Sequence, residues 1–520
     1  MNKKIYILLL ALPLLFSLYY WSYDRSDPLT FTSPHHNADF YFSNLLITEN
    51  SLAKKVPYYD ILPKEITLGF TIRDGVQNEG FNIPKRFVMP IYLTSVLINF
   101  DLLLYFVPLA SLFLLLAVFL FVKKQWGLKP AIISSLLASL FPAFWINSIW
   151  PISDTVVSFF FLFLGIFYLY EFKKKEKNLY IYLSLIFIAF SLCLRPTTVF
   201  FVAFLPIILK KQNWRKILDY KTILISLLII FIVIFPLFYL NYSLYGSPIK
   251  TGYNIASNLE KDLLGNKYSQ NSFINAGRVL LYVKGYFSIF LLTLVLFFLA
   301  FVYFFRNKID SKLLSYLFLS SLSSIVYFGS ERLWGIDGIY INSSFLRYIL
   351  PIFIISFMLL SVYISKLPWK ISILIILILI SNYSFIALTF AGGVMEQKND
   401  IYFNYNTKKV VLEKTPSNSI IISALSGKYL FPEREVITVS FWASEEDLKS
   451  NDEIFWKIYP GEKELSEKIN ALYEANPNLF ILKDQEFFND EIFEESLKLR
   501  NLNLNLVDDE IKLYRIENES

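Results

Sequence analysis

One short stretch of this sequence places residues capable of catalysis beside a long apolar segment. Residues 33–42 follow the apolar segment 5–21 and contain Asp39 with His35 and His36, the only two histidines of the chain. A carboxylate within hydrogen-bond reach can take the proton of a hydroxyl or amide as that group attacks an electrophilic carbon. Asp39 is therefore a candidate general base. The alternative is that Asp39 caps a helix that begins at the next residue, Phe40.

A second acidic residue, Asp154, opens a later apolar segment. Its carboxylate could bind an acceptor or a divalent metal ion, although a helix N-cap at Ser153 or Asp154 would produce the same pattern. His36 could join such a metal site, because imidazole is a common metal ligand. Adjacent histidines in a loop are otherwise typically solvated. The sequence leaves the need for a metal open.

Several cationic side chains lie where apolar segments end. Arginine binds phosphate through bidentate hydrogen bonds, and a site of low dielectric strengthens these bonds. The candidates for binding a phosphate group are Arg195, Arg278, Lys284 and Arg347, together with the neighbouring hydroxyl of Tyr348. At a helix end, Lys284 and Arg347 could instead extend their charged heads to the membrane interface.

The composition is that of an integral membrane protein. Of the 520 residues 55% are hydrophobic, and the mean hydropathy is +0.47. A single cysteine, Cys193, excludes an intrachain disulfide. The net charge is +6, yet acidic residues outnumber basic ones from Glu396 onward, so the preceding part is strongly basic. Its charges lie in short clusters between apolar segments, which indicates positive-inside topology and not a nucleic-acid partner.

The apolar segments predict about eleven transmembrane helices, since about 20 residues cross the hydrocarbon core. Their expected bounds are 5–21, 102–122, 131–149, 155–170, 179–194, 197–209, 222–242, 286–305, 313–329, 344–364 and 371–390. Basic connections then lie inside, which places the N-terminus in the cytoplasm of a multi-pass cell-membrane protein. Two long loops, 22–84 and 243–285, lie outside. Residues 87–98 are expected to form a short interfacial or re-entrant helix.

The predicted fold class is therefore a polytopic α-helical membrane protein with a small C-terminal α/β domain. Residues 1–395 form the transmembrane domain, and residues 396–520 form an extracytoplasmic domain. Within that tail the pattern predicts strands at 419–424, 479–483 and 511–516 and helices at 464–475 and 490–499.

Five motifs, taken in order along this chain, resemble the GT-C superfamily of membrane glycosyltransferases. Within it, the sequence resembles the branch of the protein O-mannosyltransferases and the aminoarabinose transferases of lipid A. The motifs are Asn37–Tyr41 after the first apolar segment, Pro151–Asp154 at a helix start, Leu194–Thr197 with its Arg-Pro break, Asn241–Pro248 with Thr251–Tyr253 in a loop, and Arg347–Pro351 at the start of a late helix. The sequence departs from many members at Phe40, where they carry a second acidic residue.

The resemblance implies a glycosyltransferase that takes a sugar from a polyprenyl-phosphate-linked donor on the outer face of the membrane. It assigns Asp39 to catalysis, and a single displacement would invert the sugar. The expected partners are this donor and membrane lipid, and the acceptor could be a protein, a lipid or a cell-surface glycan. The alternatives are a transporter or lipid flippase, and a polysaccharide polymerase or ligase with a lipid-diphosphate donor. A transporter would be expected to show internal repeats and charges in mid-span.

Overall fold

The computed structural model describes thirteen stretches of the chain. These are residues 3–23, 30–31, 34–67, 70, 75–85, 87–252, 276–307, 311–330, 340–423, 429–431, 433–439, 462–483 and 490–518. The chain divides into two compact units, and each unit is assembled from three separate stretches. The first unit comprises Met1–Asp24, Phe100–Leu237 and Ser272–Lys398. The second comprises Arg25–Asn99, Phe238–Asn271 and Asn399–Ser520.

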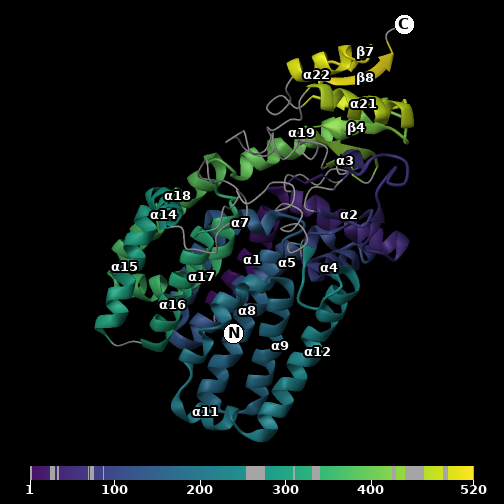
Figure 1. The fold of residues 1–520 in the computed structure, drawn as a ribbon. Coiled ribbons are helices and arrows are strands. Elements are labelled where there is room, and N and C mark those ends of the chain that lie inside the picture. Colours follow the sequence, from purple (N-terminus) through teal and green to yellow (C-terminus); the bar gives the residue numbers. More distant parts are fainter. Residues whose placement is uncertain are drawn as a thin grey trace. The chain divides into compact units, whose positions relative to one another are not determined.

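The first unit is helical (Figure 1). Its longer helices are α1 (Lys3–Trp21), α5 (Leu103–Trp126), α6 (Leu128–Leu140), α7 (Pro142–Ile149), α8 (Asp154–Lys175), α9 (Asn178–Leu194), α12 (Tyr220–Tyr245), α14 (Ala276–Ile289), α15 (Leu291–Arg306), α16 (Ser311–Ser330), α17 (Ser344–Lys366) and α18 (Trp369–Thr389). Four short helices lie between α9 and α12. They are the 3₁₀ helices η2 (Pro196–Thr198) and η3 (Leu205–Ile208) and the α-helices α10 (Val199–Val202) and α11 (Lys211–Ile217). The helices α12 and α19 (Val394–Lys414) continue from this unit into the second.

Among the described residues, six helices are long and apolar enough to cross a membrane, or eight if each of two bent pairs is one span. The chain is thus a mostly helical, multi-pass membrane protein. Every segment expected to span corresponds to helical structure, but the number eleven stays a prediction. The helix α9 has only 17 residues, and the expected span 197–209 is divided among η2, α10 and η3.

Two breaks in the first unit have local causes. The helices α6 and α7 meet at a bend of 66°, where Pro142 begins α7 and cannot donate the hydrogen bond that would continue α6. Arg195 ends α9 with extended backbone angles, as the residue before a proline usually does.

Close packing fixes α8 against α9. Gly165 lies at their crossing, where an added Cβ would approach Cγ1 of Ile188 to 2.6 Å. The Ser184 hydroxyl donates a hydrogen bond of 2.8 Å to the Gly165 carbonyl. Small residues and interhelical hydrogen bonds are the usual means of association between membrane helices. The contact holds the helices that carry Asp154 and Arg195.

The second unit contains two sheets and the helices around them. Its N-terminal part consists of α2 (Pro34–Glu49), β1 (Lys54–Lys55), α3 (Lys64–Thr67), β2 (Gly75–Asn78), β3 (Phe81–Pro84) and α4 (Val88–Asn99). The three strands pair antiparallel in the order β1-β3-β2. The short helix expected at 87–98 is therefore present as α4. The predicted outer loop 22–84 has regular structure in addition to the helical segment that was expected after Asp39.

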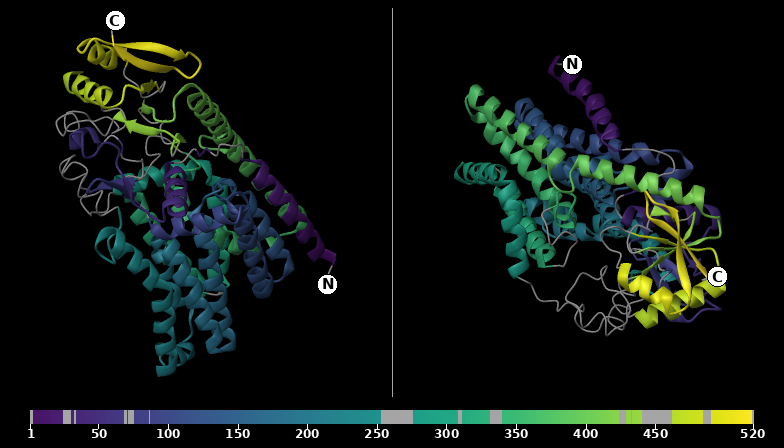
Figure 2. Two further views of the ribbon diagram at one scale, coloured as in Figure 1. Left: turned by 90° about the vertical axis from the view of Figure 1, so that its right-hand side faces the viewer. Right: turned by 90° about the horizontal axis from the view of Figure 1, so that it is seen from above.

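The tail forms a mixed sheet of five strands in the order β5-β4-β6-β8-β7. Its elements are β4 (Ile420–Ser423), β5 (Glu435–Thr438), α21 (Glu462–Ala475), β6 (Leu479–Leu482), α22 (Asp490–Lys498), β7 (Leu502–Asp508) and β8 (Leu513–Asn518). The strands β5, β4 and β6 are parallel, and β8 and β7 join antiparallel, as a two-stranded yellow ribbon in Figure 2. Each strand and helix predicted for the tail has a counterpart here, while β5 and β7 were not predicted.

One core joins the tail to the first predicted outer loop. Val56, Ile66 and Phe70 pack with apolar side chains of the sheet and of α21 and α22. All three are at least 95% buried. Residues 54–67 and Phe70 thus belong structurally to the α/β domain. The boundary expected at 395/396 had assigned that domain to the tail alone.

Candidate active site

The N-terminus of α8 carries a buried ion pair. Asp154 is the first residue of this helix, and its Oδ1 lies 3.3 Å from Nη1 of Arg195 at the end of α9. The two side chains are 8% and 3% exposed. Ser153 occupies the N-cap position, yet its side chain makes no capping hydrogen bond. Capping therefore does not explain Asp154. Because desolvation opposes the burial of such a pair, its presence points to a specific role.

Threonines on either side complete the surroundings of Arg195. Its Nε donates to Oγ1 of Thr197 at 3.2 Å, and its Nη1 also donates to the Thr155 hydroxyl. The carbonyl oxygen of Arg195 accepts a hydrogen bond of 2.8 Å from Thr198. The turn after the Arg-Pro break thus fixes both the backbone and the side chain of Arg195. Thr197 belongs to the motif 194–197, but the sequence did not predict that its hydroxyl accepts a hydrogen bond from Arg195.

Tyr348 of α17 stacks on the same guanidinium. The Arg195 Cζ lies 4.5 Å from the centroid of the Tyr348 ring. That ring also stacks on Phe328, with centroids 4.2 Å apart and planes inclined by 13°. A cation over an aromatic face is attracted by the ring quadrupole. The start of α17 is itself fixed, because Ser343 caps it by accepting a hydrogen bond from the Leu346 N–H.

Arg347 precedes Tyr348 and lies beside Trp150. Its Cζ is 5.5 Å from the Trp150 ring centroid, and its side chain is buried. The Trp150 Nε1 donates to Oε1 of Gln397 at 3.3 Å. Trp150 lies immediately before the motif 151–154 and was not among the predicted site residues. We call Trp150, Asp154, Arg195, Arg347 and Tyr348 the cationic cluster.

Of the other two predicted phosphate ligands, only Lys284 has a described side chain, and it does not belong to this cluster. Lys284 lies on α14 with an exposed side chain. Arg278 lies on the first turn of α14, and its side chain falls outside the described residues. The loop 253–275 that precedes α14 also falls outside them.

Asp39 belongs to the second unit and is buried in α2. The helix begins at Pro34, so Asp39 lies in its second turn with 3% of the residue exposed. A helix beginning at Phe40 is therefore wrong, and with it the capping role for Asp39. The missed signal is Pro34, since proline is favoured at the first position of a helix. The Asp39 carbonyl accepts a hydrogen bond of 2.5 Å from Ser43, whose hydroxyl also contacts the Ile91 carbonyl of α4.

His36 lies one turn before Asp39 on the same face of α2. It is 3% exposed and meets the Phe31 ring edge to face, with centroids 6.3 Å apart. The expectation of a solvated histidine is wrong for His36. The side chain of His35 falls outside the described residues.

Residues near the second predicted outer loop pack against the same unit. Tyr245 donates a hydrogen bond of 3.0 Å to the Pro84 carbonyl at the end of β3. An added Cβ at Gly252 would lie 2.2 Å from this same carbonyl oxygen, so only glycine fits there without a shift. Two residues after Asp39, Tyr41 meets Phe431 of the tail, with ring centroids 5.6 Å apart. Loop and tail residues thus fix the surroundings of α2.

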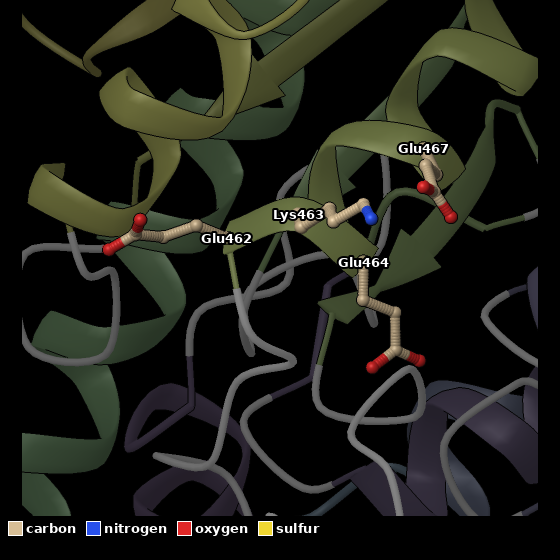
Figure 3. A pocket seen from close by; sticks show the side chains of 4 residues that line it. All are labelled: Glu462, Lys463, Glu464 and Glu467. Carbon is tan, nitrogen blue, oxygen red and sulfur yellow. The ribbon is translucent and has the colours of Figure 1, made fainter.

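No group of three or more His, Cys, Asp or Glu side chains within the described part of the chain could hold a metal ion. Asp154 and His36, the predicted metal ligands, belong to different units. A shallow hollow of about 490 Å³ opens at the start of α21, lined by Glu462, Lys463, Glu464 and Glu467. Figure 3 shows its carboxylates pointing away from one another. The hollow contains no residue of the cationic cluster.

Solved structures share this fold over nearly the whole chain. ArnT from Cupriavidus metallidurans bound to undecaprenyl phosphate superposes with a TM-score of 0.63 at 8% identity, covering 98% of this chain and 97% of that one. Its apo form gives 0.60 at 10% identity, with 98% and 96% covered. AglB, the oligosaccharyltransferase of Archaeoglobus fulgidus, solved with an inhibitory peptide and a dolichol-phosphate, gives 0.54 at 12% identity, with 93% and 70% covered.

Both neighbours are GT-C membrane glycosyltransferases. The fold that the five motifs predicted is thereby confirmed. No protein-family model matches the chain, and no curated protein sequence matches it either. At these identities the similarity defines the fold, whereas the activity must be argued from the site itself.

Proposed function

We propose that this protein is a glycosyltransferase that moves a sugar from a polyprenyl-phosphate-linked donor to an acceptor on the outer face of the membrane. The observation that carries the proposal is the buried cationic cluster, in which two arginines lie at the ends of apolar helices. Ionisable residues at such positions are functional candidates by default. The fold adds support, because ArnT was solved with undecaprenyl phosphate and AglB with a dolichol-phosphate.

The cationic cluster suits the leaving group of this reaction. When the bond between the sugar and the phosphate breaks, negative charge grows on the phosphate oxygens. Arg195 and Arg347 supply positive charge in a buried setting, where it stabilises a developing anion far more than in water. The Tyr348 ring lies against the Arg195 guanidinium.

Asp39 is the proposed general base. It takes the proton of the acceptor as the acceptor attacks the anomeric carbon, and one displacement of this kind inverts the sugar. The proposal includes a protein, a lipid or a glycan as acceptor, and it holds with or without a divalent metal ion.

The proposed topology has a cytoplasmic N-terminus, about eleven spans and an extracytoplasmic tail beginning near residue 396. Basic connections between apolar helices support it, including Lys173–Lys175 at the end of α8 and Arg306 at the end of α15. Cysteine-accessibility labelling from each side of sealed vesicles tests this arrangement.

The donor is tested in proteoliposomes that contain the purified protein and total membrane acceptor material. We expect transfer of radiolabelled sugar from a polyprenyl monophosphate donor and none from a diphosphate donor. The Arg347→Gln protein should lose most of this transfer, whereas the Arg306→Gln protein, altered at the other end of the bundle helices, should retain it. Transfer only from diphosphate donors would favour a polysaccharide polymerase or ligase. Movement of intact lipid without transfer would favour a flippase.

A further inference from the structure

The guanidinium of Arg195 uses only part of its hydrogen-bonding capacity. An arginine has five N–H donors in a planar fork. Nε donates to Thr197, and Nη1 donates to Asp154 and Thr155. Nη2 donates to no residue of the described part of the chain, although the side chain is only 3% exposed. Two donors of a buried cation are thus left for a ligand.

The direction of Nη2 is fixed by the other contacts. The Tyr348 ring, 4.5 Å from Cζ, covers the guanidinium and sets its plane. Phe328 stacks on that ring and keeps it in place. The bonds to Asp154 and the two threonines then set the rotation within the plane. Since the guanidinium is rigid, these contacts also aim both N–H bonds of Nη2.

Nη2 is not among the fully buried polar atoms that lack a partner, so a ligand can reach its two N–H groups. An anionic oxygen would satisfy both the donors and the positive charge. Asp154 is already engaged through Oδ1, which accepts from Arg195 and from the Thr155 hydroxyl, each at 3.3 Å. Asp154 thus orients the Arg195 guanidinium.

We propose that Asp154 is a positioning residue that holds Arg195 with Nη2 directed at the phosphate of a polyprenyl-phosphate lipid. This inference rests on the proposed function and replaces the role expected for Asp154 on the acceptor or a metal. Asparagine at this position keeps one acceptor but loses the charge that strengthens the bond. Lysine at position 195 carries the charge but has neither the fork nor the flat face that stacks on tyrosine.

The test measures lipid binding by the purified full-length protein in nanodiscs. The two probes are undecaprenyl phosphate and undecaprenol, which share the chain and differ in the phosphate. We expect Asp154→Asn to weaken binding of undecaprenyl phosphate about tenfold, within the range of a charged hydrogen bond, and to leave undecaprenol unchanged. Arg195→Lys should weaken it by at least as much. The double variant should bind no worse than Arg195→Lys, because Asp154 is proposed to affect phosphate binding through Arg195.

The matched control is Glu176→Gln. Glu176 caps the opposite end of α8 and forms a more exposed ion pair with Lys216, at 3.0 Å. Its loss should leave both dissociation constants unchanged. Thr197→Val removes a single contact of Arg195 and should give a smaller loss of phosphate binding. It serves as the second variant if Asp154→Asn does not fold.

Unchanged or tighter binding of undecaprenyl phosphate by Asp154→Asn and Thr197→Val would overturn the inference. Equal losses for both probes would do the same, since they would indicate a purely structural role. Failure of the proposed function has a different signature: the wild-type protein then transfers no sugar, while the phosphate-specific losses in the variants still support the positioning of Arg195.

Discussion

Phe70 is predicted to contribute strongly to the stability of the tail, although nearly 350 residues of sequence separate it from β4. Its ring is 1% exposed and packs with side chains of the sheet, of α21 and of α22. The hydrogen bond from Asn82 Nδ2 to the Phe70 carbonyl, of 3.0 Å, holds the residue in place. Replacing a fully buried phenylalanine by alanine costs about 3–5 kcal/mol.

This cost converts into a measurable shift. For domains of about 150–250 residues, 1 kcal/mol corresponds to about 2–4 °C in the midpoint of thermal unfolding. Phe70→Ala should therefore lower the midpoint by at least about 6 °C. Ile61 lies in the same part of the sequence but is 76% exposed. Ile61→Ala should shift the midpoint by no more than about 2 °C, because substitutions on the surface change stability by about 0.5 kcal/mol or less.

The assay follows the intrinsic fluorescence of the detergent-solubilised protein during heating. It also measures the rate of proteolytic cleavage at sites C-terminal to Ile420. The structure predicts that Phe70→Ala both lowers the midpoint and accelerates cleavage within the tail. Equal midpoints for Phe70→Ala and Ile61→Ala, with unchanged cleavage, would refute the shared core.

Two further predictions concern the same unit. Gly252→Ala places a Cβ 2.2 Å from the Pro84 carbonyl, so the backbone must shift at a cost of about 1–3 kcal/mol, and an unchanged unfolding midpoint would contradict this contact. The hydrogen bond from Lys414, at 2.7 Å, and backbone N–H groups lower the pKa of Asp508. Its stabilisation is therefore complete above the unfolded pKa of about 3.9 and is lost as pH falls through the lower folded pKa. Asp508→Asn should lower the midpoint at pH 7 by about 1–4 °C, as for a partly exposed pair, and should match the wild type below its folded pKa. A difference that persists in strong acid would contradict the ion pair.

The sequence predicted the parts of this protein that depend on local patterns. Apolar length and basic connections identified the helices, and the Arg-Pro dipeptide identified the break at Arg195. The motifs at 151–154, 194–197 and 347–351 lie near helix ends, which is why Asp154, Arg195 and Tyr348 could be named without a structure. Their direct contact could not be predicted, because it depends on the packing of α8, α9 and α17.

Non-local contacts account for most of what the sequence missed. Val56 and Phe70 lie in a polar segment with little periodicity, and only the distant sheet that they cover explains their burial. The strand β5 has four residues, of which the first is Glu435, and it follows Glu433 and Arg434, so its apolar signal is short. The early start of α2 at Pro34 was a missed local signal of a different kind.

The central claim is that Asp39 acts as the base in sugar transfer from a polyprenyl-phosphate donor. The most direct measurement compares wild type and Asp39→Asn in proteoliposomes supplied with the lipid-linked sugars of a total membrane extract. Because the exchange keeps size and removes the base, we expect a loss of transfer of about 10²-fold or more with an unchanged unfolding midpoint. Equal transfer by a folded Asp39→Asn protein would contradict the account.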